Sequence, residues 1–241
     1  MPNEIAVSVV AKRQTIREIK NRKEKMSETM NRILVAGGIF AVIVIAVLLE
    51  RIGIPGIYWL CMAVMFAMII EFLACLWRAP RDVMFSGKNI AIFLLFLGLL
   101  GLDLVSLITL AHRPMLILMI LVIVCATDIC AWFFGSQIGG DKMWERISEH
   151  KTWAGQIFGV IGGTAAAIAY GHWVLGTFVS QLVWIGIGIA LLSQYGDLTA
   201  SFVKRKLKIK DYSHALGGHG GIIDRFDGWI YVLPVIWAVL A

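Results

Sequence analysis

The residues best suited to chemistry in this chain are concentrated between Ser201 and Gly228, in the sequence SFVKRKLKIKDYSHALGGHGGIIDRFDG. This stretch contains six of the chain's 22 Lys and Arg residues, two of its five histidines, and three aspartates. The segments on both sides are strongly apolar. A dense polar stretch between two apolar segments indicates a site at the surface of a membrane.

The first half of this site is predicted on one face of a helix. Asp197 ends the preceding apolar segment. On a helix that continues past it, four polar residues follow within about 100° of its direction: Ser201, Lys204, Arg205 and Lys208. Such a face can bind a metal-bound phosphate through direct Lys and Arg contacts. The alternative is a basic collar that only attracts anionic lipid.

The second half is a glycine-rich loop followed by carboxylates. Residues 217–221 place four glycines around His219. Glycine lets backbone N–H groups approach an anion closely, although a flexible hinge is the alternative. His219 is expected either to contact a phosphate or to brace the loop. Asp224, Arg225 and Asp227 then add hard oxygen ligands and a cation, so Asp197 and Asp224 are predicted to hold Mg²⁺ over the phosphates of a nucleotide.

Besides Asp197, three acidic residues lie inside apolar segments, where each prompts a functional hypothesis because a charge in a bilayer is costly. Asp128 is about two turns before the end of its segment, so it is expected to line a cavity. For Glu71 and Asp103, an interhelical hydrogen bond or a polar contact lined by water is favoured over a role in function. A second polar loop, 135–155, carries Lys151 but lacks the spacing of a phosphate-binding P-loop.

The composition predicts a polytopic membrane protein made of helices. The chain has 241 residues, of which 59% are hydrophobic and 16% charged, and its mean hydropathy is +0.80. Since about 20 helical residues cross a bilayer, we expect an all-α bundle of about seven transmembrane helices. The expected spans are 33–49, 52–77, 90–111, 114–134, 153–175, 176–198 and 222–241. The last either begins among the headgroups or does not fully cross, because its first third is charged.

The positive charge follows the topology of the chain rather than a nucleic acid. Of the 22 Lys and Arg residues, 20 lie in 1–32 and in the connections 78–89, 135–152 and 199–228. With seven crossings, all these segments fall on one side, which the positive-inside rule assigns to the cytoplasm. We therefore expect a basic cytoplasmic N-terminal tail (1–32), without a cleaved signal peptide, and a transmembrane catalytic domain (33–241) whose site faces the cytoplasm.

The motifs resemble those of the phosphatidate cytidylyltransferases (CDP-diacylglycerol synthases). The family signature S-x-x-K-R-x4-K-D, then HGG-x-x-D-R-x-D, is formed here by Ser201, Lys204, Arg205, Lys210, Asp211, His219, Gly220, Gly221, Asp224, Arg225 and Asp227. Residues 194–198 and two blocks within 128–155 also resemble family motifs, so the resemblance covers 127–228. Departures occur at Gly217, Glu149, Ala154 and Gly228, where the family more often has Pro, Pro, Glu and Ser.

The resemblance implies transfer of a cytidylyl group from CTP to phosphatidate, with Mg²⁺ alone, as a pair, or beside a monovalent cation. It implies catalytic roles for Asp197, Asp224, Lys204, Arg205 and His219, with Asp197 and Asp224 as metal ligands. The implied substrate-binding residues are Ser201, Asp128, Lys151, Gly220, Gly221, Arg225 and Asp227. The implied location is the cytoplasmic membrane, and a homodimer is compatible with the pattern.

Three other functions remain open from the residues. A CTP-dependent polyprenol or lipid kinase, or a cytidylyltransferase for another lipid phosphate, would use the same polar groups. A transporter or scaffold would be expected to show internal repeats and broken helices. No repeat is found, and the charge lies at one rim of the predicted bundle.

Overall fold

The computed structural model describes residues 30, 34–35, 37–110, 112–174, 176, 180–216 and 220–240. After a helical stretch over 37–51, the elements are α2 (Gly56–Arg78), α3 (Arg81–Met84), α4 (Gly87–Leu110), α5 (Pro114–Ile138), β1 (Lys142–Trp144), β2 (Ser148–Thr152), α6 (Trp153–Trp173), α7 (Gln181–Leu207), α8 (Ile223–Phe226), the 3-10 helix η2 (Asp227–Trp229) and α9 (Val232–Leu240). The predicted tail, 1–32, lies outside the described residues except for Met30.

Five of the described helices, α2, α4, α5, α6 and α7, are long and apolar enough to cross a membrane. The prediction of a helical membrane bundle is therefore confirmed, whereas the count of seven spans stays a prediction. The expected last span is broken into α8, η2 and α9. At 1.5 Å per residue, the nine residues of α9 extend about 14 Å, roughly half of a hydrocarbon core.

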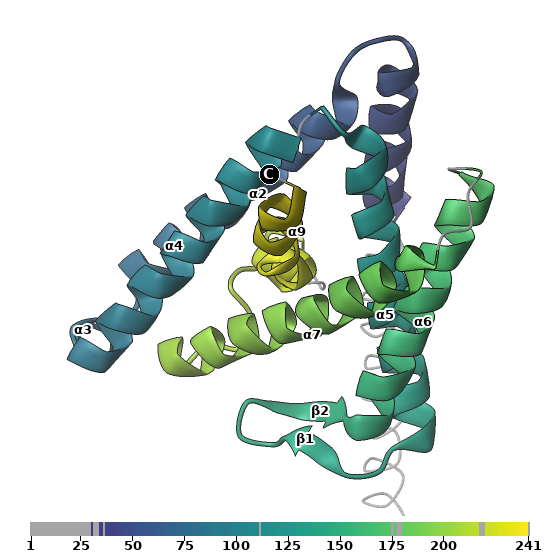
Figure 1. Cartoon of the computed structure of the whole chain (residues 1–241). Coiled ribbons are helices and arrows are strands. Elements are labelled where there is room, and N and C mark those ends of the chain that lie inside the picture. Colours follow the sequence, from purple (N-terminus) through teal and green to yellow (C-terminus); the bar gives the residue numbers. More distant parts are fainter. Residues whose placement is uncertain are drawn as a thin grey trace, which may run out of the picture.

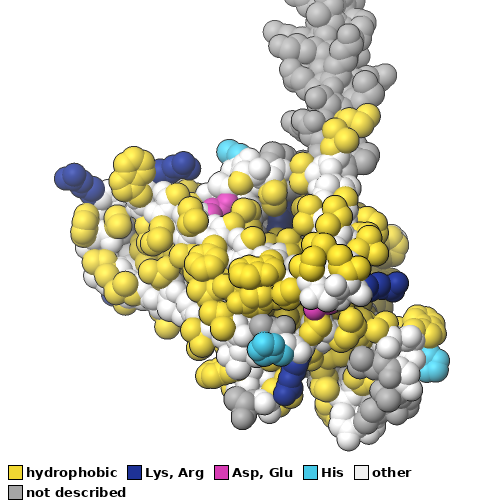
Figure 2. Space-filling view, turned by 90° about the horizontal axis from the view of Figure 1, so that it is seen from above, with side chains coloured by type: hydrophobic (Ala, Val, Ile, Leu, Met, Phe, Trp, Pro, Cys, Tyr) yellow, Lys and Arg dark blue, Asp and Glu magenta, His cyan; other side chains and the backbone are white. Residues whose placement is uncertain are grey.

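The surface of the bundle is suited to lipid. Figure 2 shows hydrophobic side chains over most of the displayed face, with few charged side chains among them. Trp77 and Trp173, at the ends of α2 and α6, are 86% and 80% exposed. Exposed tryptophans at the ends of apolar helices are typical of the membrane–water interface. This pattern agrees with helices that span a bilayer.

Glycines on α6 bring α5, α6 and α7 into close contact. A Cβ at Gly163 would lie 2.9 Å from Ala190 Cβ on α7 and would also collide with the Thr127 hydroxyl of α5. A Cβ at Gly159 would lie 3.1 Å from Ala131 Cβ of α5. Small residues let membrane helices approach closely where hydrophobic burial drives little association. In Figure 1, α5 and α6 run side by side while α7 crosses them obliquely.

The helical bundle carries a small hairpin between α5 and α6. Strands β1 and β2 pair antiparallel, with Lys142 opposite Thr152 and Trp144 opposite Ser148. The hairpin lies at the end of α5 and α6 (Figure 1), and the Thr152 hydroxyl accepts the Gly155 N–H at 3.1 Å to cap α6. The sequence pointed to a polar loop here because the strands are short and lack apolar alternation. The turn of this hairpin reaches α7.

In the second half of the fold, aromatic side chains join α2 to α4, and α9 packs on α4. Phe72 of α2 and Phe96 of α4 contact each other edge to face, with ring centroids 4.9 Å apart. Both rings also contact Tyr212, from the polar connection that follows α7. In Figure 1, α9 lies between α4 and α7. The aromatic cluster thus fixes the start of the polar connection against the α2–α4 pair.

Candidate active site

The polar residues converge on one cavity of about 590 Å³. Its walls come from α5, the hairpin, the start of α6, α7 and the α8–η2 segment. Four carboxylates and three cations line it: Asp128, Asp197, Asp224 and Asp227, with Lys151, Lys204 and Arg225. The structure therefore brings together seven of the predicted site residues, drawn from four separate segments of the chain.

Two ion pairs organise the charges in this cavity. The Lys151 ammonium lies 2.8 Å from Asp197 Oδ2, and the Lys204 ammonium lies 2.7 Å from Asp224 Oδ1. The Lys204–Asp224 pair is the more buried, with side chains 14% and 6% exposed. Ser201, one turn after Asp197, donates its hydroxyl to Asp197 Oδ1 at 3.3 Å. This pattern alternates anionic and cationic groups, which suits a ligand carrying phosphates and a cation.

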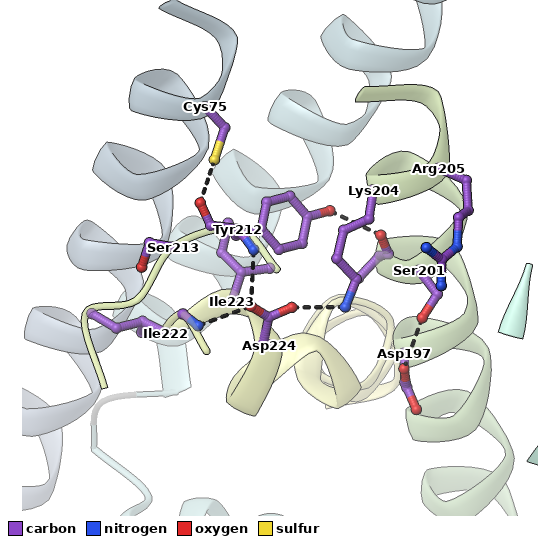
Figure 3. A network of polar contacts seen from close by, with 12 residues as sticks. Cys75, Asp197, Ser201, Lys204, Arg205, Tyr212, Ser213, Ile222, Ile223 and Asp224 are labelled. Atoms are coloured by element: carbon purple, nitrogen blue, oxygen red, sulfur yellow. Dashed lines mark hydrogen bonds and ion pairs between the residues drawn. The ribbon is translucent and has the colours of Figure 1, made fainter. Parts of the chain in front are cut away.

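Asp224 is held from the backbone as well as by Lys204. Its Oδ2 accepts the N–H groups of Tyr212 and Gly221, each at 2.9 Å. Figure 3 shows Asp224 between Tyr212 and Lys204, with Asp197 and Ser201 on the neighbouring helix. Three donors therefore fix the orientation of this carboxylate.

Asp227 adds a buried carboxyl group to the cavity. Burial raises the pKa of the Asp227 carboxyl well above its ordinary range, and the carboxylate of Asp197 raises it further, whereas Lys204 lowers it. Desolvation and a neighbouring like charge both favour the protonated form. A bound cation would relieve this repulsion, so the charge of the cavity favours cation binding.

The carboxylates can hold a magnesium ion. Both lone-pair directions of Asp224 Oδ2 are taken by N–H groups, but Oδ1 accepts only Lys204 and retains one. Within the described residues, no group of three or more His, Cys, Asp or Glu side chains forms a metal cage. Mg²⁺ is usually bound by one or two carboxylates with waters and substrate phosphates. Carboxylates that line a cavity with room for phosphates are donors of the kind that Mg²⁺ uses.

The predicted helical face on α7 is only partly directed at the cavity. The helix continues past Asp197 as expected, to Leu207. However, Arg205 Nε donates to the Ile147 carbonyl of the hairpin turn at 3.2 Å and does not line the cavity. Lys208 has a left-handed φ of 58° after the helix ends and pairs with exposed Asp82 at 3.8 Å. Ser201 does not line the cavity itself but donates a hydrogen bond to Asp197, which does.

Part of the glycine-rich loop lies outside the described residues, including Gly217, Gly218 and His219. The two glycines that follow are described. Gly220 has a φ of 80°, a conformation that favours glycine. Gly221 donates to Asp224, as described above. The loop therefore meets the cavity at Asp224, and the role of His219 stays a prediction.

Sequence reasoning missed two residues that support the site. Glu71 of α2 accepts the N–H groups of Ile222 and Ile223 at 3.1 and 2.7 Å, and also the Ser213 hydroxyl. Of the two contacts expected for Glu71, the structure shows an interhelical hydrogen bond, from Ile223 of α8, and its other partners also belong to the polar connection of the site. An acidic residue in an apolar span was the available signal. For Asp103, no hydrogen-bond partner is found among the described residues, so the expected interhelical bond is not seen.

Tyr212 is the second missed residue. It is 3% exposed, its hydroxyl donates to the Ala200 carbonyl at 3.0 Å, and its carbonyl accepts the Cys75 thiol at 2.8 Å. The Lys204 ammonium lies 5.7 Å from its ring centroid. One residue thus ties α2, α7 and Asp224 together. No local sequence pattern indicated this, because a tyrosine in a polar stretch is ordinarily exposed.

The fold and the cavity define a polytopic membrane protein with a site of paired carboxylates and lysines. Residues 4–241 match the model of the cytidylyltransferase family. The chain belongs to this family.

The chain is similar to three curated proteins, each named a phosphatidate cytidylyltransferase. The protein from Brucella suis is 38% identical over 125 residues, which are 50% of this chain and 45% of that protein. The protein from Staphylococcus aureus is 39% identical over 124 residues, 50% and 46% of the two chains. The protein from Rickettsia bellii is 32% identical over 164 residues, 64% and 71% of the two chains. The matches thus span about half the length of the first two relatives.

Proposed function

We propose that this protein transfers the cytidylyl group of CTP to phosphatidate, which yields CDP-diacylglycerol and pyrophosphate. The observation that carries the proposal is the pairing of Asp197 with Lys151 and of Asp224 with Lys204 in one cavity of a membrane bundle. The names of the relatives support the substrates. A polar cavity between apolar helices suits a reaction between a soluble nucleotide and a lipid phosphate.

The reaction requires positioning and charge neutralisation but no covalent intermediate on the protein. A phosphate oxygen of phosphatidate attacks the α-phosphorus of CTP. The bond from that phosphorus to the oxygen bridging to the β-phosphorus breaks, and pyrophosphate leaves with the bonding electrons. Lys151 and Lys204 lie at the cavity wall, where they neutralise phosphate oxygens as charge moves to the leaving group. Arg225, also at the wall, is a further candidate to bind phosphate.

Asp197 and Asp224 would hold the magnesium ion, with waters and nucleotide phosphates as its other ligands. When bound, the ion supplies Lewis-acid stabilisation of charge on the phosphate oxygens. Asp128 of α5 and Asp227 of η2 also line the cavity, and a bound cation would favour their ionised forms. The number of cations stays a prediction of the sequence.

The distribution of Lys and Arg supports a site facing the cytoplasm of the cell membrane. The hairpin, α3 and the end of α7 belong to the basic connections, and all of them would lie on this side. A cytoplasmic site has direct access to CTP. The cytoplasmic N-terminus and the homodimer stay predictions of the sequence.

A double-label assay tests the proposal. The purified protein in detergent receives Mg²⁺, phosphatidate and CTP labelled on either the α- or the γ-phosphate. Transfer of the α-label to lipid, with γ-label released as pyrophosphate, supports the proposal. Transfer of the γ-label to lipid with release of CDP would establish a kinase instead. A preference for another lipid phosphate in competition with phosphatidate would change the acceptor.

A further inference from the structure

Glu71, on α2, accepts hydrogen bonds from two ends of a backbone segment of the site. It lies about two turns before the end of α2 and is 8% exposed. Its Oε1 accepts the Ser213 hydroxyl and the Ile222 N–H, and its Oε2 accepts the Ile223 N–H at 2.7 Å. Ser213 stands at one end of the segment 213–223 and the two isoleucines at the other. One carboxylate therefore holds both ends of this segment.

The contacts of Glu71 are adjacent to those of Asp224. Asp224 Oδ2 accepts the N–H groups of Tyr212 and Gly221, which directly precede Ser213 and Ile222 in the chain. Two carboxylates thus bind donors from the same two short strips of backbone, 212–213 and 221–223. If these two strips of backbone move away from Glu71, the N–H groups of Tyr212 and Gly221 move with them, and these are the groups that orient Asp224.

A glycine beside Glu71 gives independent support. A Cβ at Gly221 would lie 2.8 Å from the carboxylate carbon of Glu71, so the absence of a side chain there permits the contact. No side chain of α8 caps the first amides of that helix. Instead, the Glu71 carboxylate on α2 accepts hydrogen bonds from the N–H groups of Ile222 and Ile223. Buried N–H groups are costly to leave unpaired.

We propose that Glu71 is a positioning residue for the metal-binding and phosphate-binding groups of this site. It fixes the backbone strips that orient Asp224, and Asp224 in turn fixes Lys204. Glu71 itself does not line the cavity and contacts no reacting group. The inference rests on the proposed function for its kinetic consequences, but its structural consequence is independent of that function.

The test is Glu71→Gln in the full chain, with Asp103→Asn as the matched control. Both change a buried carboxyl within a membrane-spanning helix to an amide, but Asp103 has no hydrogen-bond partner among the described residues. A glutamine at 71 retains one acceptor oxygen and places an NH₂ donor against backbone or hydroxyl donors.

The first measurement is amide hydrogen exchange in detergent without substrates. In Glu71→Gln, exchange at 221–223 should rise by about ten- to hundredfold, as expected when buried donors lose their acceptor. Exchange in α5 and α6 should stay unchanged. Asp103→Asn should leave 221–223 as in the unmodified protein. Unchanged exchange at 221–223, or a rise spread over all helices, would overturn the proposal.

The second measurement separates positioning from general support of the fold. In Glu71→Gln, kcat for the cytidylyl transfer should fall by about ten- to hundredfold, and half-maximal activity should need more Mg²⁺. KM for phosphatidate should change by less than about twofold, because Glu71 does not touch the lipid phosphate. A loss confined to KM for phosphatidate would contradict the proposal.

Ser213→Ala provides a milder variant that keeps Glu71 intact. It removes one of the three donors and should reduce kcat by about three- to tenfold. Because both residues act through one contact, the Glu71→Gln/Ser213→Ala double variant should lose less than the product of the two single losses. Multiplicative losses would overturn the shared contact. Should the unmodified protein lack cytidylyl transfer, the proposed function fails, while the exchange measurement still decides the role of Glu71.

Discussion

Lys204 of α7 and Asp224 of α8 form an ion pair with 2.7 Å between Nζ and Oδ1. The two residues are 20 positions apart and both side chains are largely buried. Removing one partner of a buried ion pair strongly destabilises the folded protein, because the other charge remains buried and unpaired. The pair therefore joins the helical half of the site to its loop half, and its loss has consequences for both.

Replacement of Asp224 tests the metal assignment. Asp224→Asn removes the charge but retains the approximate shape of the side chain. The protein should stay folded and inserted in the membrane, but it should unfold at a lower temperature because Lys204 loses its buried partner. Turnover should fall by about hundredfold or more, because the charge that would hold Mg²⁺ and orient Lys204 is lost. The measurement is CDP-lipid formation, with thermal unfolding in detergent as the check on folding.

Asp82→Asn is the control for this variant. Asp82 also pairs with a lysine, Lys208, but at 3.8 Å and with both side chains more than 70% exposed. Exposed pairs contribute little to stability. This variant should keep normal activity, and a near-normal rate for Asp224→Asn would refute the metal assignment.

Lys151 is expected to contribute to nucleotide binding. Lys151→Met keeps much of the apolar stem but leaves Asp197 without its ammonium partner and removes a cation from the cavity. KM for CTP should rise by about ten- to hundredfold, the typical cost of losing a hydrogen bond to a charged group. The measurement is initial rate against CTP concentration at saturating phosphatidate.

Lys142→Met, in the same hairpin, is the matched control. Lys142 is exposed and does not line the cavity. Its replacement should leave KM for CTP within about twofold, since exposed charges are largely screened. Equal effects of the two variants would mean that the hairpin acts only through its total charge.

The contact between α5, α6 and α7 depends on Gly163. Gly163→Val would press a branched side chain against Thr127 and Ala190, which are both buried. Overpacking of this kind should lower the free energy of unfolding by about 1–3 kcal/mol. Gly188→Val on α7 is the control, because a Cβ there meets no atom within 4 Å. A Gly163 variant as stable as the Gly188 variant would disprove the close packing.

We expect Asp103 to destabilise the folded protein and to have no role in the reaction. Its side chain is fully buried, and neither carboxylate oxygen has a hydrogen-bond partner among the described residues. Asp103→Leu should therefore raise the free energy of unfolding by about 1–3 kcal/mol, with unchanged turnover. A large loss of turnover on this substitution would show that Asp103 takes part in function.

The membrane class and half of the site were predictable from local sequence. Apolar segments of about 20 residues must form helices in lipid because their backbone groups have no other partners. The continuation of α7 past Asp197 was predictable too, since a helical period places Asp197, Ser201 and Lys204 on one face. The segments of the signature also indicated which carboxylates and lysines belong to the site, but not which of them pair.

The partners of these residues were decided only by tertiary structure. Lys151 could be assigned to Asp197, and Lys204 to Asp224, only once the hairpin and α8 were placed beside α7. Arg205 reaches the hairpin turn instead of the cavity, because a neighbouring carbonyl from a distant segment competes for it. Glu71 looked like an isolated intramembrane acid, and its partners are 142 to 152 positions away. Sequence spacing specifies which side chains share a helical face, but hydrogen-bond partners at such separation depend on how the helices pack.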